Sequence, residues 1–125
     1  MSKKVLLVDD DADLLSVNRA ALEGKGYKVE TAMNGKDGIK KAQDVRPDVI
    51  VLDVMMSTSS EGFDAARALR KSEETKRIPI IMLTSVNQTV PFKFEPDETY
   101  LPVSVFMEKP VKPDTLMKEI NKLLA

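Results

Sequence analysis

The sequence has 125 residues, of which 42% are hydrophobic and 31% charged, and its formal net charge is −1. This size and composition are typical of a globular chain with a real core, so we expect one domain over 1–125. The charge gives no basic footprint for nucleic acid, and the apolar runs are too short to span a membrane. The chain has no Cys and no His. This excludes disulfides, thiolate chemistry and histidine-based sites, and we expect a cytoplasmic protein.

Strand-like and helix-like patterns alternate along the chain, which predicts an α/β fold with a doubly wound parallel sheet. Short runs rich in Val, Ile and Leu are typical of parallel strands that are buried on both faces. The expected strands cover 4–8, 27–32, 48–53, 78–83 and 103–107, and the expected helices cover 11–23, 34–46, 61–71 and 113–124. In the first helix the apolar residues fall on one stripe, which we expect to face the core: Leu14, Val17, Ala21 and Leu22.

One stretch interrupts the alternation. Between the fourth and fifth expected strands a helix is due, but the segment 87–102 contains Pro91, Pro96 and Pro102. Prolines at this spacing prevent a long uninterrupted helix. We therefore expect the fourth helix to be shortened or replaced by a loop.

Two of the apolar strands run directly into carboxylates. Asp9, Asp10 and Asp11 follow the first strand, and Asp53 ends the third. If both strands belong to one parallel sheet, these side chains meet at its C-terminal edge, where open α/β sheets bind ligands. Crowded carboxylates need a cation at neutral pH, and their hard oxygen atoms favour a divalent ion such as Mg²⁺. We therefore predict a metal-assisted phosphoryl site, with Asp as the acceptor because the chain has no His.

A simpler interpretation is that the acidic run only caps the first helix, since Asp is favoured at helix N-termini. Either Asp10 or Asp11 could be the N-cap. A single cap needs only one Asp, however, so we expect Asp11 and Asp13 to serve the helix and Asp9 and Asp10 to serve the metal.

The chain resembles the receiver domain of two-component response regulators, the CheY-like family, over essentially its whole length. The resemblance rests on four motifs at strand ends: Val8-Asp9-Asp10, Asp53, Thr84-Ser85 and Lys109-Pro110. It implies a flavodoxin-like sandwich, in which a five-stranded parallel sheet in the order 2-1-3-4-5 is flanked by five helices. It also implies that a sensor histidine kinase or a phosphotransfer protein delivers a phosphoryl group to one Asp.

The resemblance assigns the phosphoryl and metal roles residue by residue. Asp53 matches the phosphoacceptor, and Asp9 and Asp10 match the acidic pair that holds Mg²⁺, with Asp10 the more direct ligand. Asp53 would be a further ligand, and Met55 would add its backbone carbonyl oxygen. Lys109 matches the cation that pairs first with Asp53 and then with the phosphoryl group.

Two more residues match positions that respond to phosphorylation in this family. Thr84 corresponds to the hydroxyl residue that bonds the attached phosphoryl group, and Phe106 to an aromatic residue whose rotamer follows it. A Phe at a strand end is equally consistent with a core position. The resemblance further implies a cis peptide bond between Lys109 and Pro110.

The sequence departs from the family pattern after Asp53. Relatives usually continue with a Met-Pro pair, whereas Met55-Met56 is followed here by the Pro-free run 57–60. Because this loop borders the acceptor, we expect donor access or the lifetime of the phosphoryl group to be altered. The proline-broken segment 87–102 lies where relatives contact their downstream partners.

We expect a phosphorylation-controlled switch that acts through protein–protein contacts or as a phosphorelay intermediate, unless the sequence is a fragment. It would be a monomer or a phosphorylation-dependent dimer, would bind no nucleic acid or membrane, and would catalyse only its own phosphorylation and dephosphorylation. One alternative is a degenerate receiver that serves as a phosphorylation-independent interaction module. A Mg²⁺-dependent phosphohydrolase is disfavoured, because position 55, where a second acid would activate water, is Met.

Overall fold

Strands and helices alternate in the computed structural model, which describes residues 3–53, 61–85, 105–109 and 111–124. The strands are β1 (Lys4–Val8), β2 (Lys28–Ala32), β3 (Val49–Asp53), β4 (Ile80–Ser85) and β5 (Val105–Lys109). The helices are α1 (Ala12–Glu23), α2 (Gly35–Val45), α3 (Glu61–Lys71) and α4 (Pro113–Leu124). The predicted shortening of a helix between β4 and β5 falls on 86–104, outside the described residues.

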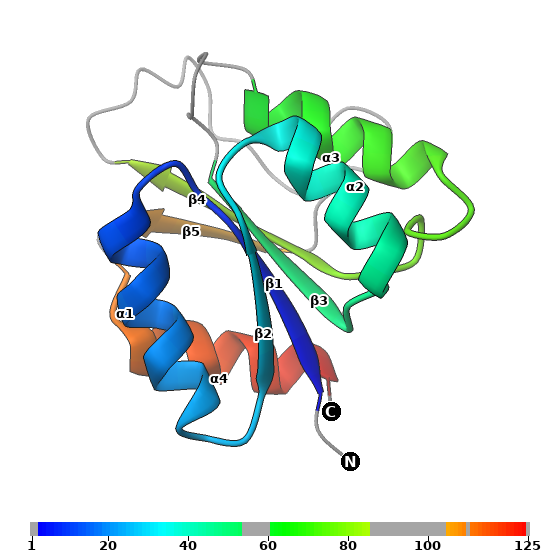
Figure 1. Cartoon of the computed structure of the whole chain (residues 1–125). Helices are drawn as coiled ribbons and strands as arrows, with labels where there is room; N and C mark the ends of the chain where they lie inside the picture. The colour runs from blue at the N-terminus through cyan, green and yellow to red at the C-terminus, as the bar shows by residue number, and fades with distance from the viewer. Residues whose placement is uncertain (1–2, 54–60, 86–104, 110, 125) are drawn as a thin grey trace.

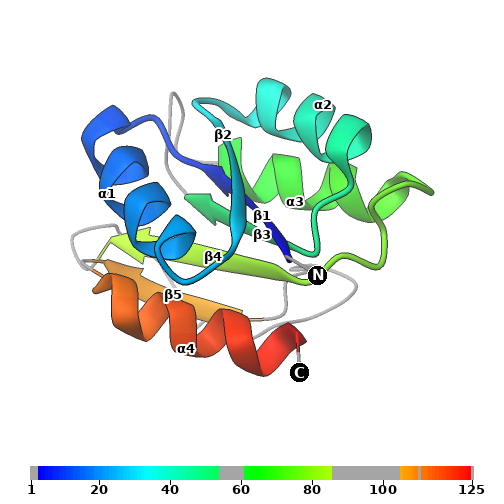
Figure 2. The same ribbon diagram turned by 60° about the horizontal axis from the view of Figure 1, so that its bottom comes forward.

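The five strands form one parallel sheet in the order β2-β1-β3-β4-β5. Helices α2 and α3 cover one face and α1 and α4 the other, as Figures 1 and 2 show from two sides. This confirms the predicted doubly wound α/β fold. Because all strands point the same way, their C-terminal ends share one edge of the sheet. No helix in the described parts of the chain is long and apolar enough to cross a membrane.

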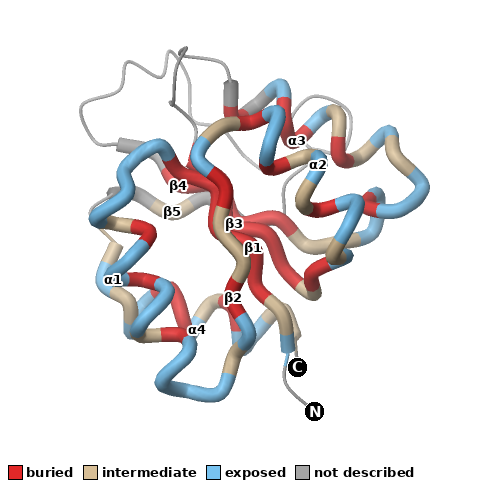
Figure 3. Tube along the Cα trace, viewed as in Figure 1, coloured by how far each residue is buried: buried red, intermediate tan, exposed pale blue. Residues whose placement is uncertain are grey.

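Alternating strand residues fill two separate cores. In β1, Leu6 and Val8 pack toward α2 and α3, whereas Val5 and Leu7 pack toward α1 and α4. Figure 3 shows β1 and β3 as buried almost throughout. Complete burial of a Val, Leu or Ile side chain stabilises a fold by about 1.5–3 kcal/mol, so these central strands anchor the residues that follow them.

The predicted core-facing stripe of α1 was right for Leu22 and Ala21 and wrong for Val17. The buried residues are Leu15, Asn18 and Leu22, whereas Val17 is 55% exposed. The predicted and the observed stripe both have helical spacing. The observed one contains the polar Asn18, which is typical of a helix face exposed to solvent. The helix begins at Ala12, directly after its N-cap Asp11.

The predicted span of β4 was wrong, since the strand runs over Ile80–Ser85 rather than 78–83. A turn precedes the strand, in which Ile78 N–H donates to the Thr75 carbonyl at 3.0 Å. Bonding to β3 begins at Pro79, whose carbonyl accepts from Ile50 N–H at 3.0 Å. Strand β5 likewise continues to Lys109, beyond the predicted end at 107. Thr84 and Lys109 are therefore paired residues near the ends of β4 and β5, and do not belong to the loops that follow these strands.

Candidate metal centre at the sheet edge

Three carboxylates converge where β1 and β3 end. The register pairs Val8 with Leu52, so Asp9 and Asp53 follow at the same level on neighbouring strands. The carboxylate oxygen atoms of Asp9, Asp10 and Asp53 lie within 4.8 Å of one another. Asp9 and Asp53 are buried and Asp10 is exposed. The structure therefore brings together the acidic residues that the sequence analysis grouped.

Backbone hydrogen bonds fix Asp9 in place. Its N–H donates to the Ala32 carbonyl of β2 at 3.1 Å, which continues the β1–β2 ladder by one residue. Its Oδ1 accepts from the N–H of Asp11 at 3.0 Å. The first contact fixes the backbone of Asp9 and the second orients its carboxylate.

Asp11 is the residue that caps α1. Its Oδ1 accepts from the N–H groups of Asp13 and Leu14, each at 3.1 Å. Asp11 therefore supplies the side-chain cap of α1, and Asp9 adds one contact at the same helix end by accepting from the Asp11 N–H. Asp11 also has a part that the sequence analysis missed, because its amide orients Asp9. A run of three Asp before a helix start is the signal that could have suggested it.

The donor set of this cluster fits a hard divalent cation. Carboxylates this close repel one another, and the repulsion is strong where Asp9 and Asp53 are withdrawn from water. An ion that takes oxygen ligands relieves it, and Mg²⁺ binds through a few carboxylates while it keeps several waters. Asp10 is exposed, so among the described residues one side of the cluster faces solvent.

The strands β4 and β5 bring two more predicted residues to the same edge. Asp53 pairs with Leu83, and Thr84 is the next residue along β4. Lys109 ends β5 opposite Ser85. Phe106 lies near the start of the same strand, opposite Met82. The side chains of Thr84, Phe106 and Lys109 are outside the described part of the structure, as are Met55 and Pro110. Their predicted roles, and the predicted cis bond, therefore stay predictions.

The family model of the response regulator receiver domain matches residues 5–121, nearly the whole chain. The chain belongs to the response regulator receiver domain family. It is 36% identical to the protein PilH of Pseudomonas aeruginosa, and the match covers 98% of each chain. Longer transcriptional regulators also match, and this chain covers 35% to 52% of their length.

Solved receiver structures have the same fold. The chemotaxis response regulator CheY4 of Vibrio cholerae is 34% identical with a TM-score of 0.82, covering 98% of this chain and 99% of CheY4. The receiver domain of the sensor histidine kinase PA1611 from Pseudomonas aeruginosa is 25% identical with a TM-score of 0.83. The match covers 99% of this chain and 98% of that domain, which holds a magnesium ion in its active-site cleft. These comparisons confirm the family and the fold that the sequence predicted.

Proposed function

We propose that this receiver domain accepts a phosphoryl group on Asp53 in a Mg²⁺-dependent reaction and acts as a phosphorylation-controlled switch. The observation that carries the proposal is the cluster of Asp9, Asp10 and Asp53 at the C-terminal edge of the sheet. Of the three, Asp53 alone ends a central strand that β1 and β4 flank on both sides. That setting gives a nucleophile a fixed position, which a flexible loop would not.

Asp9, Asp10 and Asp53 are the described residues that would hold the ion, with the backbone carbonyl of Met55 as a further ligand. The magnesium ion in the related PA1611 receiver domain supports this assignment. When bound, Mg²⁺ supplies positive charge that offsets the carboxylates and the phosphoryl oxygens. Asp9 is the residue best placed to orient the others, because its own oxygen is fixed by the Asp11 amide.

In the step that we propose, a carboxylate oxygen of Asp53 bonds to the phosphorus of a donor phosphohistidine. The bond from phosphorus to the imidazolium nitrogen breaks, its electron pair stays on that nitrogen, and neutral imidazole leaves. The product is an acyl phosphate on Asp53. The carboxylate and the phosphoryl oxygens are all negative, so catalysis here consists of positioning and charge compensation.

We assign Thr84 and Lys109 to the product. Both belong to strands that end at the same edge as Asp53, within the adjacent part of the sheet. Lys109 would supply a second positive charge, and the Thr84 hydroxyl would donate a hydrogen bond to a phosphoryl oxygen, worth about 1.5–3 kcal/mol with a charged acceptor. An energy of that size can shift a two-state packing equilibrium, with Phe106 as the responding side chain.

The partner that fits this chemistry is a histidine kinase or a phosphotransfer protein, because a phosphohistidine must be delivered to the exposed side of the cluster. The downstream contact would be with another protein, as a monomer or as a phosphorylation-dependent dimer. The chain would turn over no external substrate, and would catalyse only its own phosphorylation and dephosphorylation.

The test is intact mass spectrometry after incubation with a small-molecule phosphodonor, with and without Mg²⁺. We expect a single phosphoryl adduct that needs Mg²⁺ and disappears in Asp53→Asn. The matched control is Asp44→Asn, an exposed change on α2 with the same loss of charge. An adduct that persists in Asp53→Asn would overturn the acceptor assignment. No adduct at all would favour a phosphorylation-independent interaction module.

A further inference from the structure

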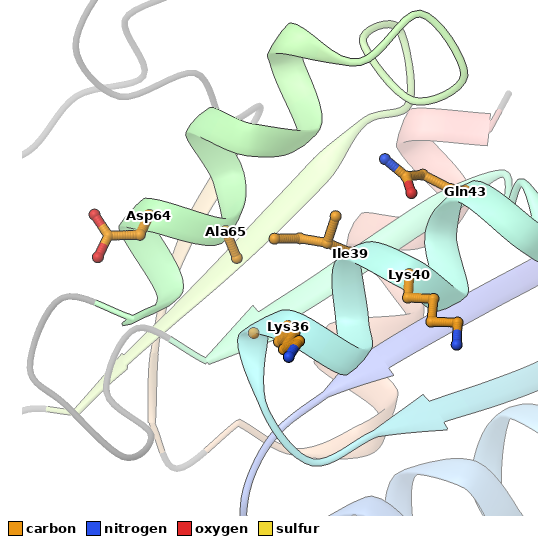
Figure 4. A pocket seen from close by; sticks show the side chains of 7 residues that line it. Lys36, Ile39, Lys40, Gln43, Asp64 and Ala65 are labelled. Carbon is orange, nitrogen blue, oxygen red and sulfur yellow. The ribbon is translucent and has the colours of Figure 1, made fainter.

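A cavity of about 320 Å³ lies between α2 and α3, on the face of the sheet opposite α1 and α4 (Figure 4). It is open to solvent along the groove between the two helices. The residues that line it are Gly35, Lys36, Ile39, Lys40, Gln43, Asp64 and Ala65. None of them belongs to the carboxylate cluster, so the cavity is a separate feature of the surface.

The floor of this α2–α3 cavity is apolar and firmly supported. Ile39 of α2 and Ala65 of α3 point toward one another across the groove in Figure 4. Ala65 is buried in the core beneath, and the partly buried Ile39 packs against that same core. Helix α2 packs close to β1 at Gly38, where an added Cβ would lie only 2.9 Å from Cγ2 of Val8. The cavity is therefore preformed, as binding sites for apolar groups usually are.

The net charge around the cavity is positive. Lys36 and Lys40 lie one helical turn apart on the α2 side, and neither forms an ion pair within the described structure. The next lysine, Lys41, does pair, with Glu30 at 3.5 Å. On the opposite side Asp64 is offset by Arg67, with their side chains 3.5 Å apart. Like charges at this spacing repel, so the two lysines favour a ligand that brings carboxylates.

We propose that the α2–α3 cavity is the docking site for an acidic amphipathic helix of a partner protein. One large apolar side chain of that helix would enter between Ile39 and Ala65. Acidic residues one turn apart would pair with Lys36 and Lys40, whose Cα atoms are separated by a rise of about 6 Å along α2. This is the helix-in-groove mode, in which an apolar anchor gives affinity and flanking charges give orientation.

The carboxylate cluster cannot serve the same partner, since Asp9, Asp10 and Asp53 would repel an acidic helix. Docking between α2 and α3 therefore needs neither Mg²⁺ nor a phosphoryl group. The proposal is independent of the phosphorylation chemistry, and it is tested without a phosphodonor and in the presence of a chelator.

The probe is a pair of synthetic amphipathic peptides of about 18 residues, long enough for a stable helix. The two peptides have the same apolar face, made of Leu. The polar face is made of Glu in the first peptide (the Glu peptide) and of Lys in the second (the Lys peptide). Each is titrated into the ¹⁵N-labelled chain while amide chemical shifts are followed. We expect the Glu peptide to bind with shifts centred on α2 and α3, and the Lys peptide to bind at least about tenfold more weakly.

The deciding variant is Lys36→Glu with Lys40→Glu, which reverses two exposed charges without touching the core. Its matched control is Lys25→Glu with Lys28→Glu, two exposed lysines at the turn into β2. We expect the first pair to weaken binding of the Glu peptide by about tenfold, and the control to leave it unchanged. Equal weakening in both pairs, shifts centred elsewhere, or no binding of the Glu peptide would overturn the proposal.

Discussion

At the scale of single residues, Asn18 is the least expected feature of the structure. Its side chain is buried on α1, and within the described residues its Oδ1 has no hydrogen-bond partner. A buried polar group without a partner lowers stability by about 1–3 kcal/mol. Leu has the same branched shape as Asn, so we expect Asn18→Leu to raise the free energy of unfolding by about 1–2 kcal/mol in chemical denaturation.

The control for this change is Ser16→Leu, at an exposed position on the same helix. It should alter the free energy of unfolding by less than about 0.5 kcal/mol. A loss of stability in Asn18→Leu would contradict the account, since it would mean that Oδ1 is satisfied in solution.

Asp10 and Asp11 are adjacent in sequence, but Asp10 belongs to the carboxylate cluster and Asp11 caps α1. Asp11 caps α1 through two backbone N–H groups, so Asp11→Ala should lower the free energy of unfolding by about 1 kcal/mol. Its amide remains, so Asp9 keeps its hydrogen bond and Mg²⁺ affinity should hold. Asp10→Ala should do the reverse, leaving stability in chelator unchanged or higher while weakening Mg²⁺ binding by about tenfold or more.

Chemical denaturation in chelator and a Mg²⁺ titration, applied to both variants, measure the two properties separately. If Asp11→Ala weakened Mg²⁺ binding as strongly as Asp10→Ala, the division of labour between these neighbours would be wrong.

At the scale of elements, the fit of α2 against β1 depends on Gly38. A Cβ there would lie 2.9 and 3.0 Å from the two methyl carbons of Val8, which is itself buried in the sheet. A β-branched side chain cannot be accommodated unless the helix shifts. We expect Gly38→Val to lower the free energy of unfolding by about 1–3 kcal/mol, measured by urea denaturation.

Lys40→Val is the matched control, because it puts the same β-branched residue at an exposed position of α2. It should change stability by less than about 0.5 kcal/mol. Since Val is a better helix former than Gly and a worse one than Lys, equal losses in the two variants would contradict a cost set by the contact with Val8.

How well the elements could be predicted depended on how their apolar residues are arranged. The strands β1 and β3 are continuous apolar runs, so their burial and the position of the carboxylates after them followed from sequence. In α1 two stripes have helical spacing, and the inward one is decided by packing in the assembled fold, where Leu15 shares a core with residues of α4. The ends of β4 and β5 depend on ladder bonds between distant segments, which no local pattern encodes. The α2–α3 cavity was not foreseen either, because it arises only when two helices pack side by side.

At the scale of the whole molecule, the fold separates two chemically different surfaces. The C-terminal edge of the sheet gathers three carboxylates, while the α2–α3 cavity carries two lysines that form no ion pair with any described residue. The formal net charge of −1 conceals this separation. The parallel topology produces the acidic edge, since every strand ends there, and helix packing produces the basic groove.

The acidic edge couples metal binding to stability. A ligand that binds only the folded state at about ten times its Kd adds about 1.4 kcal/mol to the free energy of unfolding. We therefore expect Mg²⁺ to raise the Tm in thermal unfolding by several degrees, beyond the effect of NaCl at equal ionic strength. The Asp10→Ala variant should lose most of this increase. An identical rise in that variant would place the ion elsewhere.

The central claim is that Asp9, Asp10 and Asp53 act as one metal-dependent acceptor site. The most direct measurement is the initial rate of phosphoryl-adduct formation, followed by intact mass over a range of Mg²⁺ concentrations, in the wild type, Asp10→Asn and Asp11→Asn. The account predicts a rate that saturates with Mg²⁺ in the wild type and in Asp11→Asn, and falls by at least about tenfold in Asp10→Asn. An adduct that forms at the same rate in Asp10→Asn, or without Mg²⁺, would contradict it.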